Sequence, residues 1–379
     1  MAFNPSAFDY RPDTIKRSLD QYIYGQEEAK QILSVAFWQH YSRLKRQQEQ
    51  PLDPLVSSNK PNVLLIGKSG TAKTSLPEKL CGLLGVPYAR INSTSLSEAG
   101  YVGDNTYEIV PDSIWRAANH KSAQVPFTVV HIDEIDKKAI SLADDHDVSR
   151  GAVQNDFLSI IDGNKMATKS GVVIDTAPVL FIASGAFNGI EEMVKNRISS
   201  LGFNRNQLSK GELVNQKPTR EDILKYGMLD QLVRRFPNIA YTKLYDYNDL
   251  YQILKLKKTP FISDVIRDFA ALGIAVTVED EVYQTLARLA AKPEGSGAGE
   301  LMELVNNSFR DYFYELGERQ IEAVTIDRKF IDDPKGTLDK ILRDSSLKEP
   351  QGIIPANNQL RKNNKRPKQN NKKLTGRKV

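Results

Sequence analysis

Cysteine is almost absent from this chain of 379 residues, and so are long apolar runs. The single cysteine, Cys81, excludes an internal disulfide framework and a zinc module built from several cysteines. No apolar run approaches the roughly 18 residues that a membrane-spanning helix needs, so we expect no membrane partner. The opening residues, MAFNPSAFDYRPD, lack a basic stretch followed by an apolar one, so we expect no signal peptide. These absences predict a cytoplasmic protein.

Acidic residues are missing from the end of the chain. Residues 361–379 carry nine Lys and Arg and no Asp or Glu, whereas the first 360 residues carry 43 basic and 47 acidic side chains. The formal net charge of +5 therefore comes from the tail. Residues 347–379 also hold few apolar residues, and we expect them to be disordered. Such a tail either binds nucleic acid phosphates or merely keeps the chain in solution.

The rest of the composition is that of a globular protein, with 40% hydrophobic and 26% charged residues. A chain of this length can bury a sizeable core, and we expect two domains. We place a large nucleotide-binding domain at residues 1–242, which starts with a helical segment and linker at 1–60. A small α-rich domain follows at 243–346.

The stretch PNVLLIGKSGTAKTS, residues 61–75, has the form of a phosphate-binding loop. Val63–Ile66 is a short apolar run that predicts a buried parallel strand. A turn of small residues then leads to Lys73 and Thr74, whose ammonium and hydroxyl groups suit phosphate oxygens and magnesium. We therefore expect ATP and Mg²⁺ as cofactors, with Thr74 as a metal ligand. The residues expected to bind the nucleotide in this loop are Gly67, Lys68, Ser69, Gly70, Thr71, Ala72, Lys73, Thr74 and Ser75.

Two residues of this segment depart from the usual pattern. Ala72 stands where such a loop commonly has glycine, and alanine fits there if its φ angle is negative. Pro77 falls inside the helix that we expect over residues 73–84, where its ring crowds a carbonyl and removes an N–H. We therefore expect the first turns of that helix to be distorted.

A second apolar strand is expected at Phe127–Ile132, and it ends in the adjacent carboxylates of Asp133 and Glu134. In this pattern Asp133 helps to hold magnesium, and Glu134 polarises the attacking water. A strand followed by an acidic helix cap is the plainer alternative. The position after a phosphate-binding loop favours the catalytic interpretation.

Other short runs extend the sheet. We expect strands at Tyr88–Ile91 and Val179–Ala183. Ser184 follows the second of these, and we expect its hydroxyl to sense the γ-phosphate. The order of strands and helices predicts an α/β fold with a parallel sheet.

Helical patterns occur at both ends of the chain. Residues 13–48 are expected to be helical, with Asp13 as the N-cap and a bend at Tyr22–Gln26. The small domain is expected to hold helical patterns at 246–271, 279–292 and 299–316 and strands at 273–278 and 324–326.

Three connecting segments carry residues of interest. Residues 141–152 contain Asp144, Asp145, His146 and Asp147, which we read as a solvated loop rather than a metal site. Residues 187–226 are expected to be a long, polar and irregular insertion. Its apolar tip is Leu201-Gly202-Phe203.

An aromatic residue between glycines, in Gly100-Tyr101-Val102-Gly103, is a poor core element because glycines supply no packing. It suits a loop that offers Tyr101 to another molecule. Further on, Arg234 and Arg235 are expected at the end of a short helix before Pro237.

Together these motifs resemble the ClpX family of AAA+ protein unfoldases, over residues 13 to about 316. The most specific of them is GYVG, placed between a phosphate-binding loop and a DE pair. The resemblance rests on YGQEEAK at 24–30, GYVG at 100–103, IDEIDK at 132–137, GAF at 185–187 and RRFP at 234–237.

The resemblance implies an AAA+ nucleotide-binding domain followed by a small lid domain. It implies that Ile23 and Tyr24 form a wall around the adenine. It also implies that Glu134 activates water. The residues that would hold ATP and magnesium are Gly67, Gly70, Lys73, Thr74 and Asp133.

The resemblance further implies a homo-oligomeric ring, expected to be a hexamer. Arg235 would be an arginine finger that completes the catalytic site of the neighbouring subunit. Tyr101 and Val102 would grip an unfolded polypeptide in the pore. Leu201-Gly202-Phe203 would dock on a ClpP-like peptidase.

Some features depart from the family pattern. The family's zinc-binding amino-terminal domain is not expected in this chain. Residues 163–171 are shorter than in the family and lack its Arg-Lys-His triplet. Met302 aligns with an arginine that the family uses to sense phosphate, and a thioether cannot balance phosphate charge.

The sequence therefore predicts an ATPase that unfolds proteins and threads them through a ring pore toward a ClpP-like peptidase. One alternative is a non-proteolytic or nucleic-acid-associated AAA+ motor that uses the basic tail. Another is an ATP-binding scaffold that hydrolyses poorly, because of Met302 and Pro77. GYVG favours the first function, since a nucleic-acid motor has no need of an aromatic grip in its pore.

Overall fold

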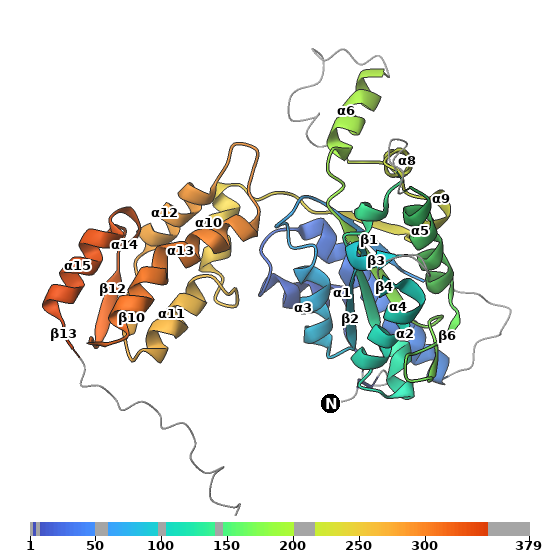
Figure 1. Cartoon of the computed structure of the whole chain (residues 1–379), viewed down its shortest axis with the longest axis horizontal. Coiled ribbons are helices and arrows are strands. Elements are labelled where there is room, and N and C mark those ends of the chain that lie inside the picture. Colours follow the sequence, from blue (N-terminus) through green and yellow to red (C-terminus); the bar gives the residue numbers. More distant parts are fainter. Residues whose placement is uncertain are drawn as a thin grey trace, which may run out of the picture.

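The computed structural model describes residues 3–4, 8–49, 60–97, 104–140, 147–200 and 217–347. They form a body built around a sheet and a second, mostly helical body, joined by the segment after β9 (Asn238–Tyr241), as Figure 1 shows. Among these residues there is no helix whose length and apolar character would let it cross a membrane.

The sheet of the first body is parallel, as the apolar runs predict. Within the described residues it has five strands, in the order β2-β5-β8-β1-β9. Asp133 at the end of β5, Ser184 near the end of β8 and the loop after β1 therefore meet at one edge. The strands not yet given are β1 (Val63–Ile66), β2 (Tyr88–Asn92), β5 (Val129–Asp133) and β8 (Leu180–Gly185).

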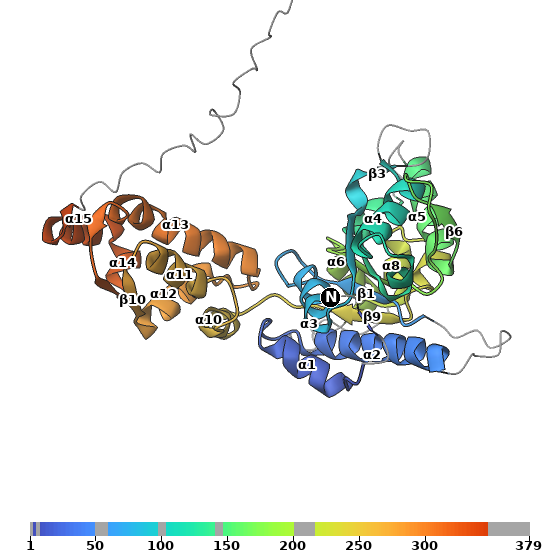
Figure 2. The same cartoon turned by 90° about the horizontal axis from the view of Figure 1, so that it is seen from below.

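Helices cover both faces of this sheet (Figure 2). Alternate residues of β1 enter different cores, because side chains of a strand point to opposite faces: Val63 packs in one, and Leu64 in the other. The first core includes side chains of α1 (Pro12–Asp20), α2 (Glu27–Glu49) and α3 (Ser75–Leu84). The second includes side chains of α4 (Thr106–Ala117), α5 (Asp147–Asp162), α8 (Arg220–Lys225) and α9 (Asp230–Val233).

Two expected helix starts were wrong. α3 begins at Ser75, so Pro77 lies in the first turn, where its missing N–H would have no partner in the helix. A proline in the first turn removes no helical hydrogen bond, so the reason for expecting a distorted helix does not apply. α1 begins at Pro12, with Arg11 as its N-cap, and Asp13 lies inside the first turn.

Two expected loops are partly helical. Asp147 to Ala152 begin α5. The insertion at 187–226 contains α6 (Ile190–Ser200) as well as α8, so it is not irregular throughout. The signal for α6 was in the sequence: Ile190, Val194 and Ile198 recur every four residues, and all three are buried.

The second body has its own hydrophobic core, formed by residues from Tyr245 onward. The expected helical run at 246–271 is two helices, because Pro260 lies in the connection between them. Two helices near its end, α14 and α15, were not expected. Its helices are α10 (Tyr247–Lys255), α11 (Ile262–Ala271), α12 (Asp280–Ala290), α13 (Ala298–Leu316), α14 (Lys329–Asp332) and α15 (Pro334–Asp344).

Short strands complete the described structure. In the second body β10 pairs in parallel with β12, and β11 pairs antiparallel with β13. In the first body β3 pairs with β4, and β6 and β7 form a hairpin. Their bounds are β3 (Leu96–Ser97), β4 (Asp104–Asn105), β6 (Lys165–Ala167), β7 (Val173–Asp175), β10 (Ala275–Val278), β11 (Arg319–Gln320), β12 (Ala323–Ile326) and β13 (Ser346–Leu347).

Candidate nucleotide-binding site

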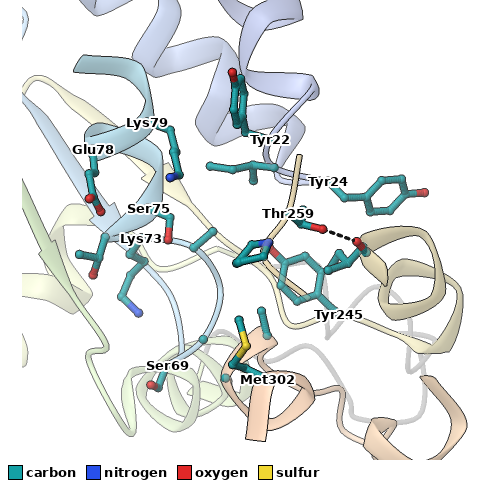
Figure 3. Close-up of a pocket in the computed structure, with 18 of the residues that line it drawn as sticks. Tyr22, Tyr24, Ser69, Lys73, Ser75, Glu78, Lys79, Tyr245, Thr259 and Met302 are labelled. Carbon is teal, nitrogen blue, oxygen red and sulfur yellow. Dashed lines mark hydrogen bonds between the residues drawn. The ribbon is translucent and has the colours of Figure 1, made fainter. Parts of the chain in front are cut away.

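A cavity of about 1310 Å³ lies between the carboxyl edge of the sheet and the second body. The loop after β1, α11 and α13 all contribute to its lining, and Figure 3 shows Met302 of α13 near Ser69 of the loop. A cavity of this size can enclose a nucleotide. From the loop and the start of α3, it is lined by Ser69, Gly70, Ala72, Lys73, Thr74 and Ser75.

Three of the loop residues that were expected to bind the nucleotide do not line the cavity. Gly67 is required by packing, since a Cβ there would lie 2.1 Å from the hydroxyl oxygen of Thr242. Thr71 is buried, and its hydroxyl donates to the carbonyl of Lys68 at 2.7 Å. The Lys68 side chain is half exposed and lies 3.9 Å from a carboxylate oxygen of Glu191. Gly67 and Thr71 therefore shape the loop.

Ala72 has a φ angle of 67°, so the condition under which alanine was expected to fit there, a negative φ, is not met. This left-handed conformation favours glycine, because the Cβ of other residues crowds the following carbonyl. The carbonyl of Ala72 accepts the N–H of Leu76 at 2.9 Å, which ties the loop to the start of α3. The loop thus has the shape that a glycine would give, at some cost in strain.

Lys73 lies at the centre of the loop. Its ammonium donates to the carbonyl of Lys68 at 2.7 Å. Burial lowers the pKa of Lys73, while the carboxylates of Asp133, Asp136 and Glu134 act in the opposite direction. A buried amine beside the cavity is suited to phosphate oxygens, which would favour its charged form.

The side chain of Asp133 accepts hydrogen bonds from Thr74, which follows the loop, and from residues of both neighbouring strands, β2 and β8. Thr74 donates to its Oδ2 at 3.0 Å, and Nη2 and Nε of Arg90 donate to the same oxygen at 2.8 and 3.1 Å. Ser184 donates to Oδ1 at 2.6 Å. Burial by itself would raise the pKa of Asp133, but these donors and neighbouring His131 lower it below the usual value. The carboxylate is therefore held charged and in place.

Ser184 does not line the cavity. It is fully buried behind Asp133, where it also lies 2.8 Å from Nε2 of His131. The other ring nitrogen of His131 lies 2.8 Å from the hydroxyl of Tyr88. Burial lowers the pKa of His131 to about 4, so its ring is neutral near pH 7. Tyr88, His131 and Ser184 form a chain of polar contacts that orients Asp133.

Sequence reasoning missed both His131 and Arg90. A signal existed for each, because His131 interrupts an otherwise apolar strand and Arg90 alternates with Ala89 and Ile91 along β2. That alternation places Arg90 on the opposite face of the sheet from its two apolar neighbours. The alternation does not indicate that β2 lies beside β5. The sequence therefore could not predict that Arg90 would pair with Asp133.

Glu134 follows Asp133 and lines the cavity. Its φ angle is 59°, which turns the chain sharply at the end of β5. The hydroxyl of Ser93 donates to its carbonyl at 2.6 Å and holds this turn. The Glu134 side chain is exposed, so its carboxylate is open to the solvent of the cavity.

Ile23 and Tyr24 both line the cavity, together with Tyr22 from the same bend. Figure 3 shows this bend on the far side of the cavity from Ser69. The bend is held to the segment after β9 through Gln26, whose Nε2 donates to the carbonyl of Lys243 at 2.8 Å. An apolar and aromatic wall suits a flat base.

The second body reaches the loop through the start of α13. The N–H of Ala298 donates to the carbonyl of Gly70 at 2.8 Å. A Cβ on Gly70 would lie 2.7 Å from the Cα of Gly297, so this approach requires glycine. Along α13, the residues that line the cavity are Ala298, Gly299 and Met302, all of them uncharged.

Arg235 lies outside this cavity, on the surface after α9. Its Nη2 donates to Oδ2 of Asp162 at 3.0 Å, and this carboxylate raises the pKa of Arg235. Its carbonyl accepts from Asn62 at 2.9 Å. The guanidinium is partly exposed, so it is accessible to another molecule.

Several predicted residues lie outside the described part of the chain. They include the segments expected to grip a polypeptide and to dock on a peptidase, and most of the acidic loop. These residues are Gly100, Tyr101, Val102, Gly103, Asp144, Asp145, His146, Leu201, Gly202 and Phe203.

The donor set at Thr74 and Asp133 fits magnesium. Mg²⁺ prefers oxygen ligands and is commonly bound by one or two protein groups together with substrate phosphates. No group of three or more His, Cys, Asp or Glu residues that could hold a metal by itself occurs in the described ranges. A loop with Lys73 and Thr74 beside a strand that ends in Asp133 and Glu134 defines an ATPase of the phosphate-binding-loop class.

Comparisons with known proteins agree with this class. The family model for the AAA domain (Cdc48 subfamily) matches residues 58–239. The chain is 32% identical over 355 residues to "ATP-dependent Clp protease ATP-binding subunit ClpX 3" of Methylococcus capsulatus, which covers 84% of this chain and 81% of the relative. It is also 32% identical over 333 residues to the ClpX subunit of Borrelia duttonii, covering 83% of this chain and 77% of the relative.

This identity over most of both chains shows that the chain belongs to the ClpX family. The resemblance expected from the motifs is confirmed, and so is the α/β fold with an AAA domain and a parallel sheet.

Proposed function

We propose that this chain is the ATP-hydrolysing subunit of a ring that unfolds proteins and translocates them through its pore. The observation that carries the proposal is the cavity in which Lys73, Thr74, Asp133 and Glu134 converge, closed on one side by the second body. A nucleotide bound there would touch both bodies. Its hydrolysis would therefore change how they pack, which is how a bound ligand drives a mechanical step.

Each residue of the cavity has a role in this proposal. Thr74 and Asp133 would hold Mg²⁺, which would supply positive charge that neutralises the phosphates. Lys73 turns from the Lys68 carbonyl to the phosphate oxygens. Glu134 orients the attacking water and accepts its proton. Ser184 and His131 keep Asp133 charged and aligned.

The assembly and its partners follow from the family. The relatives are named as subunits of the Clp protease, and we propose that this chain likewise serves a ClpP-like peptidase. The position of Arg235, outside the cavity of its own chain, supports a homo-oligomeric ring in which it serves a neighbour. In such a ring Tyr101 is the proposed contact with the polypeptide, and Leu201-Gly202-Phe203 is the proposed contact with the peptidase.

One experiment separates hydrolysis from unfolding. ATP binding, ATP hydrolysis and unfolding of a stable tagged protein are measured for the parent chain, Glu134→Gln and Tyr101→Ala. Glu134→Gln is expected to bind ATP and lose at least about 10²-fold in hydrolysis, because the amide cannot accept the proton of water. Tyr101→Ala is expected to hydrolyse ATP near the parent rate without unfolding the protein.

Normal turnover in Glu134→Gln would contradict the assignment of the catalytic base. Full unfolding by Tyr101→Ala would contradict the translocation proposal. A parent chain that hydrolyses ATP only when nucleic acid is added would favour a nucleic-acid motor instead.

A further inference from the structure

The cavity lacks a positive charge on the side formed by α13. None of the residues of α13 that line the cavity is charged; they are Ala298, Gly299 and Met302. The first turn of α13 contains an acidic residue, Glu300. A triphosphate brings about four negative charges into the site, and each unbalanced charge weakens binding. A cation from another element is therefore of interest.

Arg90 of β2 lines the same cavity. In the sheet register it pairs with His131 of β5, two residues before Asp133. Its guanidinium and the Thr74 hydroxyl donate to one carboxylate oxygen, Oδ2 of Asp133. That shared oxygen places the positive charge of Arg90 beside the metal and phosphate end of the cavity.

The other cations that line the cavity are Lys73, Lys79, Lys137, Lys257, Lys258 and Arg267. Among the cations that the second body contributes, two have partners of their own. Lys258 donates to Gln21 and lies over the ring of Tyr22, on the bend. Arg267 pairs with Asp264 on its own helix. Neither has a contact with Asp133 among the described residues, so Arg90 is the arginine best placed for the phosphates.

The side chain of Arg90 is also free to serve a second partner. It is 52% exposed, whereas Asp133 is 7% exposed. Its remaining nitrogen, Nη1, has no hydrogen-bond partner within the part of the chain that the structure describes. A guanidinium offers five N–H donors in a fork that suits phosphate oxygens. A cation bound at Asp133 would repel the guanidinium toward the phosphates.

We propose that Arg90 contacts the terminal phosphate of the bound nucleotide and supplies, from β2, the positive charge that α13 does not. This assignment rests on the proposed function, because it requires that ATP bind in this cavity. Before binding, the same guanidinium balances Asp133. After binding, it distinguishes ATP from ADP, since ADP lacks the phosphate that it would reach.

The test measures binding without hydrolysis. Affinities for a fluorescent, non-hydrolysable ATP analogue and for fluorescent ADP are determined with Mg²⁺ present, for the full chain, Arg90→Met and Arg90→Lys. Arg90→Met is expected to lower ATP affinity by about tenfold or more relative to ADP affinity, because a charge-assisted hydrogen bond is lost. Arg90→Lys should recover part of this difference. Arg116→Met, at an exposed arginine of α4, is the matched control and should bind as the parent does.

Two further backgrounds exclude an indirect effect. In Asp133→Asn, Arg90→Met should still lower ATP affinity relative to ADP affinity, since the phosphate contact does not need the carboxylate. Met302→Arg, added to Arg90→Met, should restore the preference for ATP, because it places a cation on α13 in the same cavity.

Three results would overturn the assignment. The first is an unchanged ratio of ATP to ADP affinity in Arg90→Met. The second is an equal loss of both affinities with a lowered melting temperature, which would mark a structural role. The third is an effect that disappears in the Asp133→Asn background. A parent chain that binds no nucleotide, with or without Mg²⁺, would overturn the proposed function itself and this assignment with it.

Discussion

Ala72 adopts a backbone conformation that favours glycine, in the loop that lines the cavity. We predict that Ala72→Gly raises the free energy of unfolding by about 1 kcal/mol. Removing the Cβ relieves the left-handed strain, and this gain exceeds the added entropy of glycine in the unfolded chain. Thermal or urea denaturation measures the change.

The control for this prediction is the reverse change at a matched site. Gly85 follows α3 with a φ angle of 66°, and a Cβ there meets nothing within 4 Å. Gly85→Ala should therefore destabilise the chain by about the amount that Ala72→Gly gains. If Ala72→Gly proves destabilising, Ala72 has packing contacts that outweigh its strain.

His40 is fully buried in α2 beside Arg43 and Tyr41. Burial, together with the charges of Arg43 and Lys60, holds its pKa well below the usual value. As pH falls through about 6.5, the unfolded chain binds a proton at this residue and the native chain does not. We predict that stability falls with acidification, by up to about 1.4 kcal/mol per pH unit from this group.

His40→Leu tests the assignment of that slope. Unfolding free energies measured between pH 6.5 and 5 should change less with pH in His40→Leu than in the parent chain. His120→Gln, at an exposed histidine, should keep the slope of the parent because His40 remains in place. Equal slopes in His40→Leu and the parent would assign the acid sensitivity to other groups.

At the scale of elements, Asn62 joins three parts of the first body at the start of β1. It is 2% exposed. Its Oδ1 accepts the N–H of Phe181 in β8 at 3.0 Å, and its Nδ2 donates to the carbonyl of Arg235 after α9 at 2.9 Å. One asparagine therefore links the strand that leads to the phosphate-binding loop with the backbone of the proposed arginine finger.

We predict that Asn62→Ala lowers the free energy of unfolding by about 2–4 kcal/mol, because it leaves a buried N–H and a carbonyl without partners. Denaturant unfolding measures this loss. Asn164→Ala, at an exposed asparagine that bonds to Ser159, should have an effect below about 1 kcal/mol. A small loss in Asn62→Ala would mean that water replaces the side chain.

At the scale of the whole molecule, the position of Arg235 outside its own cavity predicts a shared catalytic site. Arg235→Ala chains and Glu134→Gln chains should each be inactive. Mixed together, they should recover part of the ATPase activity, because some interfaces then hold both an intact arginine and an intact glutamate. ATPase assays on mixed assemblies, checked by sizing, measure this recovery.

Arg234→Ala is the matched control, since Arg234, the C-cap of α9, pairs with Asp230 at the start of the same helix. It should keep the parent ATPase rate by itself. Verified mixed assemblies that show no recovery would rule out a site shared in trans.

Local patterns in the sequence were sufficient for the phosphate-binding loop, the Asp133-Glu134 pair and the parallel strands. Each depends on residues adjacent in the chain, and a buried strand or a loop of small residues has a composition of its own. The motifs also indicated the ClpX family, which the relatives confirm. The predicted starts of α1 and α3 differ from the observed starts, Pro12 and Ser75, because residues at helix boundaries carry weak local signals.

Only the tertiary structure decided which distant residues meet. Arg90 and Asp133 are 43 positions apart in the chain, and their ion pair exists because β2 lies beside β5. The positive φ of Ala72 reflects how the loop must turn to reach α3, which overrides the preference of alanine. Ser184 was expected at the phosphates and instead lies behind Asp133, because β8 sits next to β5 and delivers its hydroxyl there. Sequence periodicity records which face a side chain takes, whereas strand order alone determines its neighbours on that face.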